Sequence, residues 1–126
     1  MSGSDPRVCA LCPKLCRFAC PVAEATADEA ATPTSMMQAW LAAKAGRMPW
    51  AEAAEAFERC TGCEACRAPC EHDQDVPGML YAARAEAWEQ GAVAEGSRRV
   101  HAVHLATGTP FGLAAPPAEP DLPRDK

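Results

Sequence analysis

Isoleucine is absent from this 126-residue chain, and other large apolar residues are few. The hydrophobic share of 48% consists mostly of 28 alanines and eight cysteines, which leaves 25 Val, Leu, Met, Phe, Trp and Tyr side chains. Burying one large apolar side chain stabilises a fold by roughly 1.5–3 kcal/mol, whereas ordering one residue costs about 1.5 kcal/mol. A core this thin predicts a marginal fold unless disulfides or metals add stability, as they do in other small domains.

Signals for export, membrane insertion and nucleic-acid binding are also missing. The first residues, MSGSDPRVC, contain one basic residue and no apolar segment, so we expect no secretory signal and a cytoplasmic protein. The longest uncharged run, residues 100–118, holds three prolines and two glycines, which disfavours a membrane-spanning helix. A net charge of −5 without a basic stripe argues against nucleic acid as a partner. In a reducing compartment, cysteines are more often metal ligands than disulfides.

Strand patterns and catalytic constellations are absent as well. No segment alternates apolar and polar residues, and β-branched residues are scarce, so we predict an all-α fold. Four helical segments are expected: from Pro33 to a stop at Gly46, from Pro49 to Cys60, from Pro77 to a stop at Gly91, and over residues 93–106. Residues 21–31 fit either a loop or a weak helix. Without a glycine-rich phosphate loop, a Ser/His/Asp set or paired carboxylates, we predict no catalytic residue and no catalytic activity for this chain alone.

The expected apolar faces of three helices follow a helical spacing. They comprise Met36, Met37, Trp40 and Leu41; Trp50, Ala53, Ala54 and Phe57; and Leu80, Tyr81, Ala83, Ala87 and Trp88. We predict a flexible N-terminus over residues 1–8, a single domain over residues 9–108, and a disordered tail over residues 109–126. The tail prediction depends on five prolines among its last 17 residues.

What the chain does contain is eight cysteines in two groups of four. The first group is Cys9, Cys12, Cys16 and Cys20, followed by Pro21, and the second is Cys60, Cys63, Cys66 and Cys70. Three thiols two residues apart, with a fourth after three more, is the spacing with which chains hold cubane iron–sulfur clusters. Two such groups predict a protein that carries two clusters and transfers electrons.

In two-cluster ferredoxins the fourth cysteine of each run ligates the other cluster. Applied to this chain, the rule assigns one set of ligands to each of two [4Fe–4S] clusters. Cluster 1 would bind Cys9, Cys12, Cys16 and Cys70, and cluster 2 would bind Cys60, Cys63, Cys66 and Cys20. Such an exchange would join the two motifs across the 39-residue insertion between them.

The first group has one residue more than the usual spacing, because three residues separate Cys12 from Cys16. Cluster 1 is therefore expected to be an ordinary, a distorted or a three-iron centre. Cys12, Cys16 and Cys20 also recur every four residues, a spacing that would align them on one face of a single helix. The main alternative for both groups is zinc, which would make the chain a zinc-stapled protein-interaction module.

With these motifs the sequence resembles the α-helical ferredoxin, or 4Fe–4S dicluster, domain over roughly Val8 to Glu89. The segments CRFACPVA, CTGCEACRAPC and VPGMLYAARAEA carry the resemblance. The similar proteins are the iron–sulfur subunits of heterodisulfide reductase, glycolate oxidase, anaerobic glycerol-3-phosphate dehydrogenase and succinate dehydrogenase. The resemblance implies a helical bundle stapled by two clusters. It also implies a redox partner, either a flavoprotein or an oxidoreductase with a cysteine-rich CCG domain. One departure is Glu71 after Cys70, where the family has proline.

Several polar residues near the cysteines have two interpretations. His72 either tunes a cluster through an N–H···S hydrogen bond or is a solvated turn residue. Four cations flank the cysteines and either raise cluster potentials and mark a docking face, or are solvated charges. These cations are Lys14, Arg17, Arg59 and Arg67.

Overall fold

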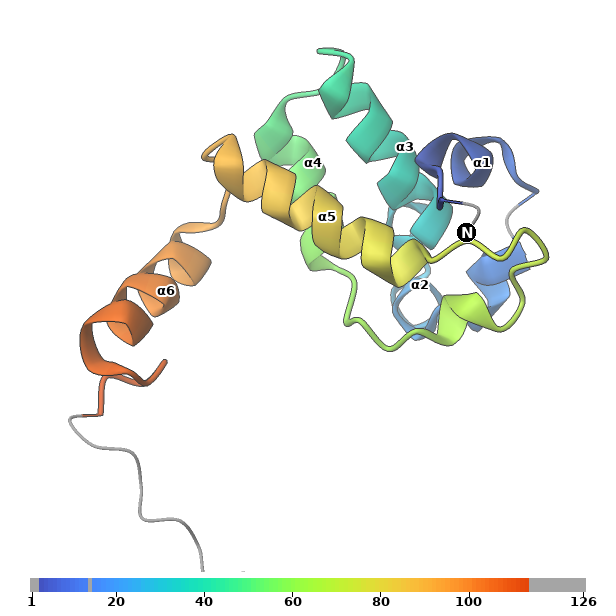
Figure 1. Ribbon diagram of the computed structural model, residues 1–126. Helices are drawn as coiled ribbons and strands as arrows, with labels where there is room; N and C mark the ends of the chain where they lie inside the picture. Colours follow the sequence, from blue (N-terminus) through green and yellow to red (C-terminus); the bar gives the residue numbers. More distant parts are fainter. Residues whose placement is uncertain (1–2, 14, 114–126) are drawn as a thin grey trace, which may run out of the picture. The chain divides into compact units, whose positions relative to one another are not determined.

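The computed structural model describes residues 3–13 and 15–113, over which the chain forms helices and no strands. The α-helices are α1 (Pro6–Leu11), α2 (Pro21–Thr26), α3 (Pro33–Lys44), α4 (Trp50–Glu58), α5 (Val76–Glu89) and α6 (Glu95–Thr107). Three short 3-10 helices, η1 (Leu15–Ala19), η2 (Glu29–Ala31) and η3 (Ala65–Arg67), lie between them (Figure 1). The prediction of an all-α fold is confirmed.

Proline together with a polar capping residue starts α3 and α5, whereas α4 begins after Pro49 without a side-chain cap. Thr32 caps α3, where its hydroxyl oxygen accepts a hydrogen bond from the Ser35 backbone N–H at 3.3 Å, and Pro33 follows. Asp75 caps α5 by accepting from the Gly78 N–H at 3.2 Å. These caps satisfy backbone donors that a helix leaves without partners in its first turn. The helices expected at positions 33, 49 and 77 therefore begin within one residue of those positions.

One helix differs from the expectations, and a second adopts one of two alternatives that the sequence left open. Helix α1 begins inside the N-terminal segment that was predicted to be flexible, because Asp5 caps it by accepting from the Arg7 N–H at 2.9 Å. The segment is also tied to a distant loop: the Asp5 N–H donates to Gln74 Oε1 at 2.7 Å, and the Asp75 N–H donates to Ser4 Oγ at 2.8 Å. Residues 21–26 adopt the helical alternative and end at Ala27, whose φ of 51° is left-handed.

The hydrophobic core lies between α3, α4 and α5, and α1 packs against α3 (Figure 1). Met36, Met37, Trp40, Ala53, Ala54, Phe57, Leu80, Ala83 and Ala87 of the predicted faces are buried. Tyr81 and Trp88 are 57% and 41% exposed, so the predicted face of α5 was too wide. The buried alanines fill little volume, which confirms that this core is built from few large side chains.

The chain divides into two compact units, with the boundary between Ala92 and Val93. The first unit holds both cysteine groups. The second contains α6, which has no buried residue and ends at Gly108 with a φ of 75°. The single domain predicted over residues 9–108 therefore spans this boundary. Of the predicted tail, residues 114–126 lie outside the described residues.

No helix in the described part of the chain is both long enough and apolar enough to cross a bilayer.

Candidate metal centres

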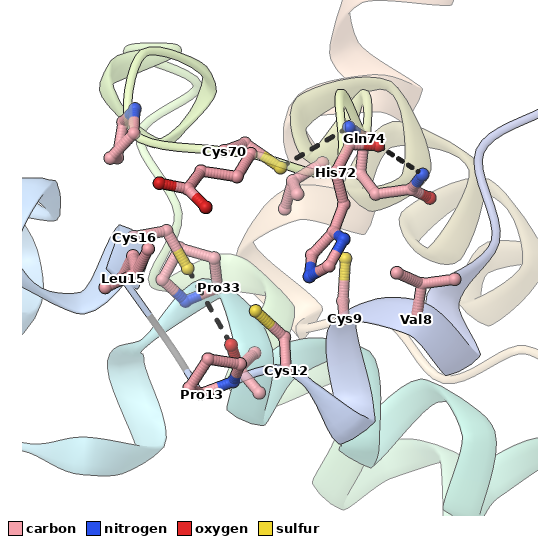
Figure 2. Close-up of a pocket in the computed structure, with 14 residues that line it drawn as sticks. Val8, Cys9, Cys12, Pro13, Leu15, Cys16, Pro33, Cys70, His72 and Gln74 are labelled. Carbon is pink, nitrogen blue, oxygen red and sulfur yellow. Dashed lines mark hydrogen bonds between the residues drawn. The ribbon is translucent and has the colours of Figure 1, made fainter.

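The eight cysteines line two cavities, four in each. The first, cavity 1, is lined by Cys9, Cys12, Cys16 and Cys70 (Figure 2). The second, cavity 2, is lined by Cys20, Cys60, Cys63 and Cys66. Each cavity takes three thiols from one sequence group and the last thiol of the other group. The structure thus brings together the two sets that the ligand exchange requires, while their binding to clusters stays a prediction.

Short helices and the turns after them position the thiols of cavity 1. Cys9 is buried on α1, and Cys12 follows the end of that helix. Cys16 lies on η1, which packs against η3 of the second group, and Cys70 follows η3. The expectation that Cys12, Cys16 and Cys20 share one helical face is wrong: α1 ends at Leu11 and η1 begins only at Leu15. Cys20 lines cavity 2 instead.

The loop that follows α4 curls around cavity 2. Two residues of this loop, Gly62 and Glu64, have left-handed φ values of 72° and 61°. A larger residue at Gly62 would strain the backbone at this φ, and the exposed Tyr81 hydroxyl, 2.8 Å from the position of a Cβ, would have to move aside. Glycine therefore allows this loop to carry Cys60 and Cys63 to the same cavity.

Arg84 of α5 holds the start of this loop. Its Nε and Nη2 donate hydrogen bonds to the Phe57 carbonyl oxygen at 3.1 and 2.6 Å, and its Nη2 also donates to the carbonyl oxygen of Cys60. Carbonyl groups at the end of a helix have no intrahelical partner, and charged donors satisfy them strongly. Arg84 therefore joins the C-terminal end of α4 to the cysteine loop.

The two cavities share a wall, because Pro33 lines both. Burial, and after it the neighbouring Cys16, Cys60 and Cys63 thiols, raise the pKa of Cys66 to about 12. Burial also raises the pKa of Cys9 to about 11, with Cys70 as the next cause. A metal binds thiolates, so loading these cavities must displace protons from the buried thiols.

Hydrogen-bonding groups surround several of the sulfur atoms. In cavity 1 the Gln74 N–H donates to Cys70 Sγ at 3.4 Å, and Cys16 Sγ lies 3.7 Å from the Thr34 hydroxyl oxygen (Figure 2). In cavity 2 the Gly62 N–H donates to Cys60 Sγ at 3.4 Å, and the Cys20 thiol donates to the Ala31 carbonyl at 3.7 Å. Donors to sulfur orient cluster ligands and help to set reduction potentials.

Gln74 connects the turn after the second cysteine group to the segment before the first. It is only 8% exposed, and its side chain accepts from the Asp5 N–H at 2.7 Å and donates to the His72 carbonyl at 3.0 Å. Asp73 beside it has a left-handed φ of 48°. These contacts fix the turn after Cys70 against the segment that precedes Cys9, so they hold opposite walls of cavity 1 together.

His72 and the arginines near the cysteines differ in their surroundings: His72 lines a cavity, whereas the arginines form ion pairs at the surface. His72 lines cavity 1, and Figure 2 shows its ring directed into the cavity on the side of Cys9. Arg17 pairs with Glu29, Arg59 with Asp28, and Arg67 with Glu64 and Asp75. These arginines are exposed, and pairing of this kind contributes little stability. Lys14 lies outside the described residues.

Three residues of the site escaped prediction from the sequence: Thr34, Gln74 and Arg84. Thr34 follows a helix-initiating proline and Gln74 lies in a polar turn, so neither position signals a site. Arg84 did carry a signal, because it lies four residues after Leu80 and three before Ala87, on the buried face of α5. A charged residue there requires a buried partner.

The donor set suits an iron–sulfur cluster. Cluster iron is bound by four soft thiolates, and each cavity presents four cysteines. Among residues 3–13 and 15–113, no three Cys, His, Asp or Glu side chains are grouped to hold a single metal ion. A family model described as "4Fe-4S dicluster domain" matches residues 6–74, more than half of the chain.

The chain belongs to this dicluster family. It is therefore an iron–sulfur protein of the ferredoxin-like, electron-transferring type, and its cofactor class is [4Fe–4S]. The matched residues run from the start of α1 to Gln74, and they include all eight cysteines. Searches with this chain found no significant match among curated proteins or solved structures.

Proposed function

We propose that the chain holds two [4Fe–4S] clusters, one in each cavity, and relays single electrons between two redox partners. The observation that carries this proposal is the division of the eight cysteines into two sets of four, each mixing three thiols of one group with one of the other. When bound, each cluster accepts and gives up one electron. The chain's own residues bind the clusters, orient the ligands and exclude water from the shared wall at Pro33.

For cavity 1 we propose a [4Fe–4S] cluster rather than a three-iron centre. Four cysteines line this cavity, and a three-iron centre needs one ligand fewer. Cys70 in particular is oriented by the Gln74 N–H and by the turn that Gln74 fixes. The extra residue between Cys12 and Cys16 therefore does not reduce the number of thiols that line the cavity.

The partners that we propose are a flavoprotein or a CCG-type oxidoreductase as donor and a second redox protein as acceptor. This part depends on the resemblance to iron–sulfur subunits that work beside such units. A cytoplasmic location is consistent with thiols that must stay reduced until iron binds. Because the described residues include eight cysteines that can serve as cluster ligands, we propose that the chemistry of this chain is electron transfer.

Electron paramagnetic resonance of the anaerobically purified, dithionite-reduced protein tests this proposal. Two reduced cubanes on either side of one proline wall are expected to interact magnetically, which broadens the spectrum beyond that of an isolated cluster. Partial reduction should first give a simpler spectrum from the cluster that is reduced first. A fully reduced protein that shows one isolated signal, of one spin per chain, would contradict the two-cluster relay.

A further inference from the structure

Thr34 is a buried polar residue, and its hydroxyl does not serve as the cap of a helix. Its side chain is 1% exposed, it lies in the first turn of α3, and the cap of that helix is Thr32. A buried hydroxyl without a hydrogen-bond partner destabilises a fold. The partner that the structure provides is Cys16 Sγ, 3.7 Å from Thr34 Oγ1 at the wall of cavity 1.

The direction of this hydrogen bond depends on the state of Cys16. With a free thiol, either group can donate. A thiolate that ligates iron has no proton, so the hydroxyl of Thr34 must then be the donor. Hydrogen bonds to charged acceptors are roughly twice as strong as those between neutral groups. Thr34 therefore stabilises negative charge on this ligand.

Cys16 lies on the side of cavity 1 that faces cavity 2. It lines cavity 1, and η1, on which it lies, packs against η3, which carries Cys66 of cavity 2. Pro33, the neighbour of Thr34, forms the shared wall. A hydrogen-bond donor to Cys16 therefore lies on the side of cavity 1 that faces cavity 2, and an electron that passes between two clusters would cross this side.

Cavity 2 has a different set of groups around its sulfur atoms. There the Gly62 N–H donates to Cys60, but Cys20 faces the Ala31 carbonyl, which cannot donate to a thiolate. Among the described contacts to sulfur, the Thr34 hydroxyl is the side-chain donor that one residue change can remove without altering the backbone. It therefore distinguishes the two cavities chemically.

We propose that Thr34 is a tuning residue of the relay, whose hydroxyl donates to ligated Cys16 and raises the reduction potential of the cluster in cavity 1. This proposal rests on the two-cluster function proposed above. One-electron reduction adds one negative charge to the centre, and a donor to a ligand sulfur stabilises that added charge. Thr34 consequently favours the reduced state in cavity 1 and leaves cavity 2 unchanged.

The test is an anaerobic redox titration, followed by electron paramagnetic resonance, of the wild-type, Thr34→Val and Thr34→Ser proteins. Valine keeps the shape of threonine and removes the hydroxyl. We expect Thr34→Val to lower the equilibrium constant for reduction in cavity 1 about tenfold, about 59 mV for a one-electron couple. Thr34→Ser should restore most of the potential. Thr26→Val is the matched control, because the Thr26 hydroxyl donates to the Val22 carbonyl on α2 and contacts no sulfur that the structure describes.

The possible outcomes distinguish a failure of the tuning role of Thr34 from a failure of the proposed two-cluster function. If the wild-type protein shows two clusters and Thr34→Val leaves both potentials unchanged, the tuning role is wrong and the relay stands. If Thr34→Val and Thr34→Ala both fail to load cavity 1 while Thr34→Ser loads it, Thr34 serves assembly, which also overturns tuning. A wild-type protein without clusters would overturn the function itself.

Discussion

Replacing Cys70 with alanine is expected to remove the cluster of the other sequence group. Cys70 stands at the end of the second group, yet it lines cavity 1 with Cys9, Cys12 and Cys16. Cys70→Ala should therefore leave cavity 2 with four thiols and reduce the iron content of the protein by about half. Iron analysis, with electron paramagnetic resonance of the reduced protein, should show one cluster free of magnetic interaction.

The reciprocal change is its matched control. Cys20→Ala should empty cavity 2, because Cys20 lines that cavity with three thiols of the second group. To assign the surviving cluster, each variant can be combined with Cys63→Ala, which removes a thiol from cavity 2 only. Cys20→Ala with Cys63→Ala should keep one cluster, whereas Cys70→Ala with Cys63→Ala should keep none. If the second pair retained a full cluster and the first pair none, ligands would not be exchanged between the groups.

Removal of iron is expected to unfold most of the first unit. Its core contains few large side chains, and the eight cysteines that line its two cavities would be joined only through bound metal. Metal binding at structural zinc sites provides about 10–16 kcal/mol at pH 7, whereas a whole domain is stable by only about 5–15 kcal/mol. A chelated, reduced protein should therefore lose most of its far-ultraviolet circular dichroism and its cooperative thermal transition.

The control for this experiment is reconstitution. Anaerobic addition of iron and sulfide to the same sample should restore both the helical signal and the transition, which distinguishes unfolding from irreversible damage. A reductant must be present throughout so that freed thiols do not form disulfides. An iron-free protein that melts cooperatively with full helical content would show that the α3–α5 core folds alone, contrary to this expectation.

The sequence was sufficient for those features that depend on local rules. A capping residue followed by proline marked the starts of α3 and α5, because the cap satisfies the first turn of its own helix, and Pro49 alone marked the start of α4. The spacing of the cysteines indicated the cofactor class, which the family match supports. The same start signal precedes α1, where Asp5 caps the helix and Pro6 follows, but the helix has only six residues, too few for a helical periodicity to be visible.

Contacts between residues distant in the chain could not be predicted from the sequence. Gln74 lies 69 positions from Asp5, and their hydrogen bond depends on how the two cysteine groups meet. Thr34 approaches Cys16 only because α3 packs beside η1. Arg84 reaches Cys60 from another helix. The groups that would tune and position the clusters are thus set by tertiary structure, whereas the ligands themselves are visible in the chain.

The most direct test of the two-cluster assignment is a joint assay of iron, zinc and acid-labile sulfide in anaerobically purified protein. Two cubanes predict about eight iron atoms and about eight sulfides per chain, with negligible zinc. Stoichiometric zinc without sulfide would contradict the assignment, and the cavities would then be zinc sites of an interaction module.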